Sequence, residues 1–156
     1  MAAESLLLIV VTPERQLLHE SVDDVQLPGA NGYLGILPGH APLVTELGIG
    51  ELIFRSGQQT HHLAMMRGFA EVLPDRTTVL AEIAERPEEI DVNRARAAFE
   101  RAQKRLSTRD PGLDWDRASL ALQRAIIRMQ VAGRSAAATR RAARRSASGM
   151  LPTLSP

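Results

Sequence analysis

The first 84 residues alternate short apolar runs with turn-forming residues. Eight of the eleven glycines and five of the nine prolines lie in this part of the chain. Turn residues recurring at this spacing are typical of a small all-β domain. The pattern predicts nine strands, at Leu6–Val11, Gln16–Glu20, Val22–Leu27, Gly32–Leu37, Leu43–Leu47, Glu51–Phe54, Thr60–Ala64, Phe69–Leu73 and Thr77–Ala81. A single sheet of such strands would leave one face wet, so we expect a closed barrel or, more simply, a sandwich of two packed sheets.

After Ala84 the apolar period changes to that of a helix. A first stripe consists of Ala95, Ala98, Phe99, Ala102 and Leu106. Asp91 is the expected N-cap of this helix, and the segment 108–113, with Pro111 and Gly112, should end it.

A second stripe follows, with Asp114 as its expected cap. It consists of Trp115, Ala118, Leu122, Ala125, Ile126 and Met129. Two amphipathic helices joined by a short connection predict an antiparallel hairpin. Because an alanine-rich seam buries little area, we expect the hairpin to be the less stable half, able to dock and undock.

Charge separates the two halves, although the whole chain has a net charge of only +1. Residues 1–84 hold 4 arginines against 10 acids, net −6, whereas residues 85–156 hold 15 basic residues against 8 acids, net +7. We therefore divide the chain into a β domain over 1–85, a helix-turn-helix domain over 86–133 and a basic tail over 134–156. The tail has arginines and no acid, which predicts a disordered, solvated segment or a contact for an acidic protein surface, anionic lipid or nucleic acid.

Composition excludes cysteine chemistry, a membrane-spanning segment and a secretory signal. The chain has no cysteine, and its longest apolar run, Leu6–Val11, is too short to cross a bilayer. The N-terminus lacks the basic region of a secretory signal. Aromatic residues make up only 3% of the chain, which disfavours base-stacking platforms.

The sequence offers no constellation of catalytic or metal-binding residues. His61 and His62 are adjacent in a predicted strand, so their side chains should point to opposite faces. His40 lies in a sharp loop and is expected to be a hydrogen-bonded structural histidine. Gly29, Gly32 and Gly35 lack the lysine and hydroxyl residue of a phosphate-binding loop. We assign no catalytic residue and no metal ligand.

Arginines on the two predicted helices are the stronger signal. Arg94 and Arg101 share one face of the first helix, and Arg124 and Arg128 share one face of the second. In an antiparallel hairpin the two pairs could converge near Glu85 and Asp91. Their spacing alone is compatible with a solvated face or with a polyanion site.

Two stretches resemble a known family. Residues 32–44, Gly-Tyr-Leu-Gly-Ile-Leu-Pro-Gly-His-Ala-Pro-Leu-Val, with the turn Leu47-Gly48-Ile49-Gly50, resemble the epsilon subunit of the bacterial F-type ATP synthase. Ile90-Asp91-Val92-Asn93-Arg94-Ala95 matches the nucleotide-binding motif at the start of that family's C-terminal hairpin. The resemblance spans about residues 4–132.

The resemblance implies an α+β, two-domain fold, with an N-terminal β-sandwich of about ten short strands followed by the α-helical antiparallel hairpin. It also implies a non-catalytic rotor subunit that contacts the gamma subunit and the c ring and couples the catalytic head to that ring. When extended, the hairpin would reach the alpha and beta subunits and inhibit ATP hydrolysis. The implied location is the cytoplasmic side of the bacterial inner membrane, held there only through the complex.

The family's contacts are carried over residue by residue. Its regulatory ATP site falls on Glu85, Ile90, Asp91, Arg94, Ala95, Arg101, Arg124 and Arg128. The resemblance implies no required cofactor, with ATP as a regulatory ligand. Partner contacts are expected at Gly29, Ala30, Asn31, Gly32, Tyr33 and His40. The alternative from the charge pattern is an anion- or nucleic-acid-binding module that uses the basic C-terminal half.

Overall fold

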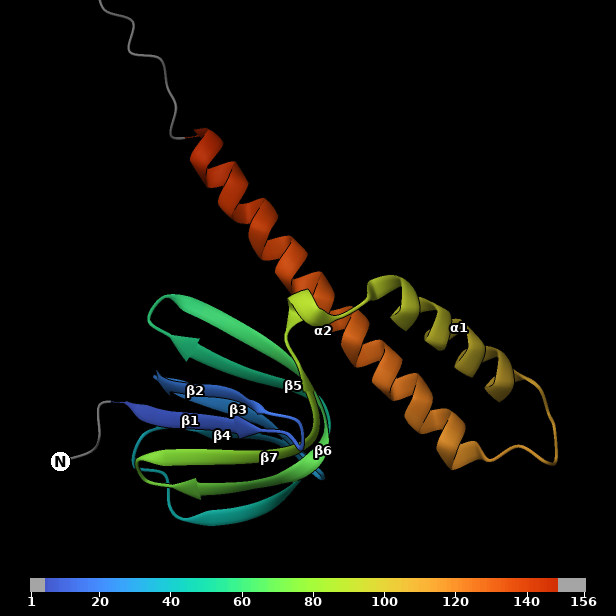
Figure 1. Cartoon of the computed structure of the whole chain (residues 1–156), viewed down its shortest axis with the longest axis horizontal. Coiled ribbons are helices and arrows are strands. Elements are labelled where there is room, and N and C mark those ends of the chain that lie inside the picture. The colour runs from blue at the N-terminus through green and yellow to red at the C-terminus, as the bar shows by residue number, and fades with distance from the viewer. Residues whose placement is uncertain (1–4, 149–156) are drawn as a thin grey trace, which may run out of the picture.

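Seven strands and two long helices make up the part of the chain that the computed structural model describes, residues 5–148. The strands are β1 (Leu6–Val11), β2 (Gln16–Val22), β3 (Asp24–Gly29), β4 (Gly32–Ile36), β5 (Leu43–Ser56), β6 (Gln59–Leu73) and β7 (Arg76–Glu85). A short 3-10 helix, η1 (Pro87–Glu89), leads to α1 (Val92–Ser107) and α2 (Trp115–Ser148). Figure 1 shows the strands curving around a common core, with the two helices lying to one side.

The strands form a sandwich in which three long strands serve both layers. The hydrogen-bonded order is β2-β1-β7-β6-β5-β3-β4. In one layer β1 pairs with only the first half of β7, and in the other β3 pairs mainly with the second half of β5, reaching Leu47 through Gly29 after a register shift. Leu8, Leu27 and Phe54 are buried between the layers. The predicted sandwich is confirmed, with seven strands instead of about ten, because β5, β6 and β7 each contribute to both layers.

The long strands bend at glycines, and at these glycines the sequence wrongly predicts that the strands end. Gly48 and Gly50 predict a break in β5, yet a Cβ at Gly50 would lie 2.6 Å from Pro28 Cβ and 2.9 Å from the Tyr33 hydroxyl. Gly50 thus lets β3 and β4 approach a continuous strand. In β6, Arg67 has φ 60° and Gly68 has φ 150°, in the left-handed region. The separate strands predicted on either side are joined by this bend.

The predicted hairpin is confirmed. Asp91 Oδ1 accepts from the Arg94 N–H at 3.0 Å, and Asp114 Oδ1 accepts from the Arg117 N–H at 3.0 Å, so both expected caps form. Figure 1 shows α1 and α2 side by side and antiparallel. Four alanines of the two stripes are buried: Ala95, Ala102, Ala118 and Ala125. Trp115 is 51% exposed, so its predicted place in the buried stripe is wrong.

Helix α2 does not end near residue 133 but continues to Ser148. The prediction of a disordered tail is wrong for residues 134–148, which we call the C-terminal extension. Alanine and arginine are among the best helix formers, and a single glycine at 133 costs only about 1 kcal/mol. The remainder of the expected tail, 149–156, lies outside the described residues. Neither described helix carries an apolar stretch able to span a bilayer.

The bend in β6 generates a stability prediction. In Gly68→Ala the new Cβ would lie 2.1 Å from the Leu80 carbonyl oxygen, at a backbone φ that disfavours alanine. We expect the free energy of unfolding in urea to fall by about 3 kcal/mol. Gly35→Ala is the control, because a Cβ there meets nothing within 4 Å, and it should change stability by less than about 0.5 kcal/mol. Equal unfolding midpoints for the two variants would contradict this account of the bend.

Candidate functional site

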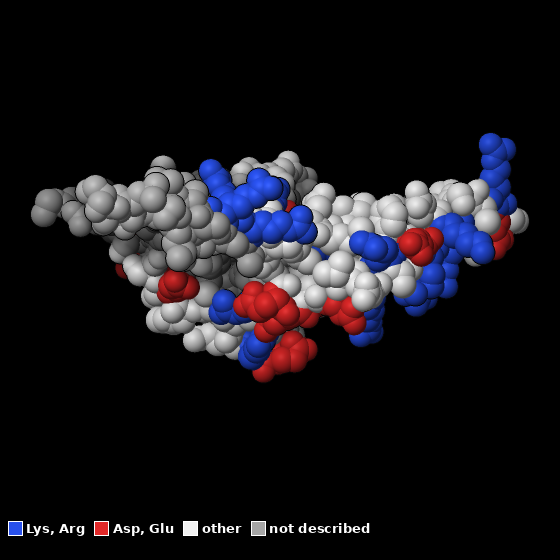
Figure 2. Space-filling view, turned by 90° about the horizontal axis from the view of Figure 1, so that it is seen from above, with Lys and Arg blue, Asp and Glu red and all other residues white. Residues whose placement is uncertain are grey.

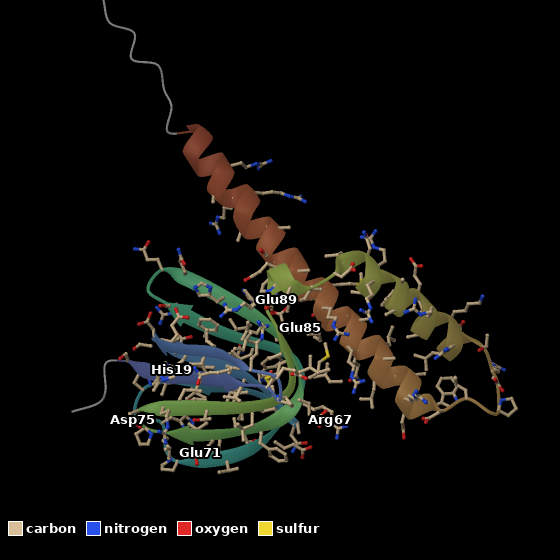
Figure 3. All side chains as sticks on the ribbon, viewed as in Figure 1. His19, Arg67, Glu71, Asp75, Glu85 and Glu89 are labelled. Carbon is tan, nitrogen blue, oxygen red and sulfur yellow. The ribbon has the colours of Figure 1, made fainter. Side chains whose placement is uncertain are left out.

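The segment that joins the sandwich to the helices is tied to the first hairpin of the sandwich. Arg15 forms an ion pair with Glu89, and the Arg86 guanidinium donates to the Leu17 carbonyl at 2.9 Å. Glu89 also accepts from the Arg86 N–H at 2.9 Å. Figure 3 shows Glu85 and Glu89 at this junction. The linker is therefore held to the sandwich by two polar contacts, and the hydrogen bond from the Arg86 N–H to Glu89 lies within the linker itself.

Electrostatics keep the Glu89 carboxylate charged in this position. Partial burial opposes the charged form, but the hydrogen bonds from Arg15 and from the Arg86 backbone outweigh it, and the pKa of Glu89 is lowered. The ion pair with Arg15 is therefore intact at neutral pH.

A small apolar contact docks the hairpin on the sandwich. Val131 of α2 packs with Ala64 of β6 and Ile90 of the linker, and all three are buried. Ile127 packs against this cluster from the same helix. The sequence stripes missed Ile127 and Val131, because these residues lie on the face of α2 that meets the sandwich rather than α1. The sequence did contain an indication of this second face, because Ile127 and Val131 are apolar, four residues apart and outside the predicted stripe.

Two ionic contacts flank the apolar cluster. The Arg128 guanidinium donates to both carboxylate oxygens of Glu85, at 2.7 and 3.2 Å. On the other side, Glu51, which is 4% exposed, lies 3.1 Å from His62 Nδ1 and 3.5 Å from Arg134 Nε. A bidentate guanidinium–carboxylate pair is the stronger of the two arrangements. Glu85–Arg128 is thus the main polar contact of the docked state.

The residues predicted to bind a nucleotide divide into two groups. Within the first, Glu85 and Arg128 bind each other, Ile90 belongs to the docking cluster, and Ala95 is buried in the helix seam. Asp91 is occupied as the N-cap of α1.

The second group consists of the remaining arginines. Arg94 and Arg101 are exposed on α1. Arg124 is half-buried on α2, and within residues 5–148 its Nε is buried without a hydrogen-bond partner. Of the predicted residues, the structure therefore brings Glu85 and Arg128 into direct contact. Within residues 5–148, the Arg124 Nε–H on α2 is left without a hydrogen-bond acceptor.

The residues predicted to contact partners lie at the β3–β4 hairpin end and in the β4–β5 loop. The β3–β4 turn and the strand residues beside it, Gly29, Ala30, Asn31, Gly32 and Tyr33, line a shallow hollow of about 240 Å³ together with Thr45 and Glu46 of β5. The Tyr33 hydroxyl accepts from the Glu51 N–H at 3.2 Å, although the ring is largely exposed. His40 lies in the β4–β5 loop, where its Nδ1 is 2.7 Å from the Ala41 carbonyl oxygen. The expected hydrogen-bonded histidine is confirmed.

An exposed apolar strip on the outer face of the sandwich was not predicted. Phe69 of β6 pairs directly with Leu80 of β7, and Val44 of β5 lies diagonally beside Phe69, whose direct partner on β5 is Glu46. These side chains are 58%, 56% and 71% exposed. Adjacent exposed apolar residues on one face of a sheet are a candidate interaction surface. The sequence contained an indication of this strip, because the three apolar residues occupy strand positions that alternate with buried positions and should therefore face solvent.

The two sequential parts of the chain match two family models. Residues 5–87 match the ATP synthase delta/epsilon chain beta-sandwich domain, and residues 88–133 match the ATP synthase delta/epsilon chain long alpha-helix domain. The C-terminal extension begins where the second match ends.

Individual relatives agree with the family models. The ATP synthase epsilon chain of Syntrophobacter fumaroxidans is 50% identical over 130 residues, covering 83% of this chain and 97% of that protein. The ATP synthase epsilon chain of Koribacter versatilis is 57% identical over 102 residues, covering 65% and 72% of the two chains. A chain in the Euglena gracilis mitochondrial ATP synthase structure of OSCP, F1 and c-ring has the same fold, with a TM-score of 0.70 at 23% identity over 79% of this chain and 78% of that one.

Proposed function

The chain belongs to the ATP synthase delta/epsilon chain family, and we propose that it is the central-stalk rotor subunit that couples the catalytic head of an F-type ATP synthase to the c ring. The family resemblance drawn from the sequence is confirmed. The epsilon chain is a non-catalytic accessory subunit, so the expectation that this chain is not an enzyme is confirmed through its relatives. Family membership favours this function over a nucleic-acid-binding module.

The exposed apolar strip is the observation that carries the rotor assignment. Val44, Phe69 and Leu80 would remain in water in an isolated chain, whereas a permanent partner would bury them. We assign this face to the gamma subunit. The β3–β4 turn around its hollow, and His40 in the neighbouring loop, are assigned to the c ring. Through these contacts the chain would associate with the cytoplasmic side of the bacterial inner membrane without entering it.

The hairpin is proposed to be a movable arm that inhibits ATP hydrolysis when it extends toward the alpha and beta subunits. Its docked position is stabilised by a small apolar cluster, Ala64, Ile90 and Val131 with the partly buried Ile127, and by the ionic contacts of Arg128 with Glu85 and of Arg134 with Glu51. An element held by so small an interface can be displaced by a coupling free energy of about 1–3 kcal/mol. Extension would release Arg128 from Glu85 and present it to an acidic partner surface.

ATP is proposed as a regulatory ligand of the docked hairpin. Arg94, Arg101, Arg124 and Arg128 would supply guanidinium groups to the phosphates, and the buried Nε of Arg124 would gain the hydrogen bond that it lacks. Arg128 is shared in this proposal, because phosphate oxygens would compete with the Glu85 carboxylate for its donors. Binding would stabilise the docked arm by mass action, and no hydrolysis would occur at this site.

The first test addresses the apolar strip. Phe69→Glu places a charge in the proposed gamma interface, and we expect the chain to fold normally but to lose at least about tenfold in its affinity for the rest of the complex. Val92→Glu is the matched control, because Val92 is also exposed but lies on α1. Co-purification and circular dichroism measure the two effects. Normal assembly of the Phe69→Glu chain would remove this face from the interface.

The second test addresses inhibition. Truncation after Arg86 removes the hairpin and the extension, and a complex reconstituted with it should hydrolyse ATP faster than the complex with the full chain. Assembly and ATP synthesis should persist, because the sandwich supplies the proposed rotor contacts. Unchanged hydrolysis in an assembled complex would reject the inhibitory role and leave the rotor role standing.

The third test addresses ATP. Calorimetric titration of the full-length chain with MgATP should show binding whose affinity falls by about tenfold or more in Arg94→Ala, since one charged hydrogen bond contributes about 1.5–3 kcal/mol. Arg96→Ala is the control, because Arg96 is exposed on the same helix but lies outside the motif. Absence of heat at millimolar ATP would reject the regulatory site.

A further inference from the structure

The C-terminal extension creates a groove that the family models do not include. The matched helical domain ends at residue 133, whereas α2 continues to Ser148. Between the extension, the β5–β6 turn and the linker lies an open groove of about 810 Å³. In Figure 1 this part of α2 is the upper end of the long orange-red helix, beyond the level of η1. We call this space the extension groove.

Positive charge predominates around the extension groove. Its walls include Arg86 of the linker and Arg134 and Arg141 of α2, so three guanidinium groups come from two different elements. Two acids accompany them, Glu88 in the wall and Glu51 against Arg134. Arg140 and Arg144 add charge from the exposed side of the same helix. In Figure 2 one group of blue side chains lies on this part of the molecule, and further blue side chains lie along the hairpin.

Several of the groove residues are held in place before any ligand binds. Arg86 donates to the Leu17 carbonyl, and Arg134 lies beside the buried Glu51. His61 stacks on Phe54, with ring centroids 4.9 Å apart and an angle of 17° between the planes. Side chains fixed by such contacts lose little conformational entropy when they bind a ligand.

Arg141 differs from the other two arginines of the groove. Among residues 5–148 it has no ion-pair partner, and it is exposed. Its neighbour Arg140 has the same charge on the same helix but does not line the groove. A ligand in the groove should therefore depend on Arg141 and be nearly indifferent to Arg140.

We propose that the extension groove binds an anion that carries a chain of phosphate groups. Guanidinium forks match phosphate oxygens in geometry, and several forks around one space favour several linked phosphates over one. The volume is in the range of small-molecule sites and exceeds what a single phosphate fills. The partly exposed ring of His61 adds a flat surface, so a nucleoside triphosphate and an inorganic polyphosphate share the recognised chemistry.

Binding there would bridge the extension, the β5–β6 turn and the linker. A ligand that binds only when these three elements are together stabilises the docked position of the hairpin by mass action. This regulatory consequence depends on the proposed function of the hairpin, whereas the binding itself does not. The groove is also separate from the proposed ATP site, because Arg94 and Arg101 lie on α1 and do not line it.

Calorimetric titration of the full-length chain with tripolyphosphate at about 0.15 M salt tests the proposal. We expect binding that weakens by about tenfold in Arg141→Ala, the loss expected for one charged hydrogen bond. Arg140→Ala, the matched control, and the double variant Arg94→Ala/Arg101→Ala should each change affinity by less than about twofold. Absence of binding, or equal losses from Arg140→Ala and Arg141→Ala, would overturn the proposal, because equal losses indicate general attraction to a basic helix.

A parallel titration with MgATP in the Arg94→Ala/Arg101→Ala background identifies the source of the phosphate chain. Binding that again requires Arg141 would support a groove that accepts nucleoside triphosphates. If only tripolyphosphate requires Arg141, the result supports a groove selective for inorganic chains. Because these titrations use the isolated chain, their failure would leave the assembly test of the rotor function untouched.

Discussion

The bend in β6 is the constraint on which the other surfaces depend. Gly68 lies so close to the Leu80 carbonyl that no side chain fits, and there the strand turns from one layer of the sandwich into the other. Its first half carries Ala64 and His62 to the face that receives α2, and its second half carries Phe69 to the exposed strip. One strand thus connects the docking face of the hairpin with the proposed gamma interface.

The contacts between sandwich and hairpin fall into two groups, one that ties the linker and one that docks the helices. Arg15 and Arg86 tie the linker to the first hairpin of the sandwich. Beyond the linker, a few aliphatic groups and the Glu85–Arg128 pair stabilise the docked position. Arginines take part in both groups of contacts. A guanidinium that binds a carboxylate in the docked position can bind a phosphate or another carboxylate after the hairpin moves.

Much of the architecture was predictable because local signals suffice for it. The caps at Asp91 and Asp114 and the alanine seam involve residues within one or two helical turns, and they form as expected. The continuity of β5 through Gly50 and of β6 through Gly68 was not predictable, since each glycine responds to a segment distant in sequence, Pro28 in one case and Leu80 in the other. The exposed strip and the roles of Ile127 and Val131 also depend on which elements meet. At the candidate nucleotide site, the motif predicted the residue types. It did not predict the pairing of Glu85 with Arg128, because these two residues are distant in the sequence.

By itself the sequence determined the order of a β domain and a helical hairpin, the charge difference between them and the family motif. Hydrophobic periodicity and helix capping depend on residues close together in the chain, and a motif is visible in the sequence itself. Only the tertiary structure decided how far α2 extends, what it faces and which arginines share a space. The composition of residues 134–148 is compatible with a solvated basic tail and with a helix, because alanine and arginine suit either in water. The continuation of α2 past the β5–β6 turn places Arg134 against Glu51 and Arg141 in the groove.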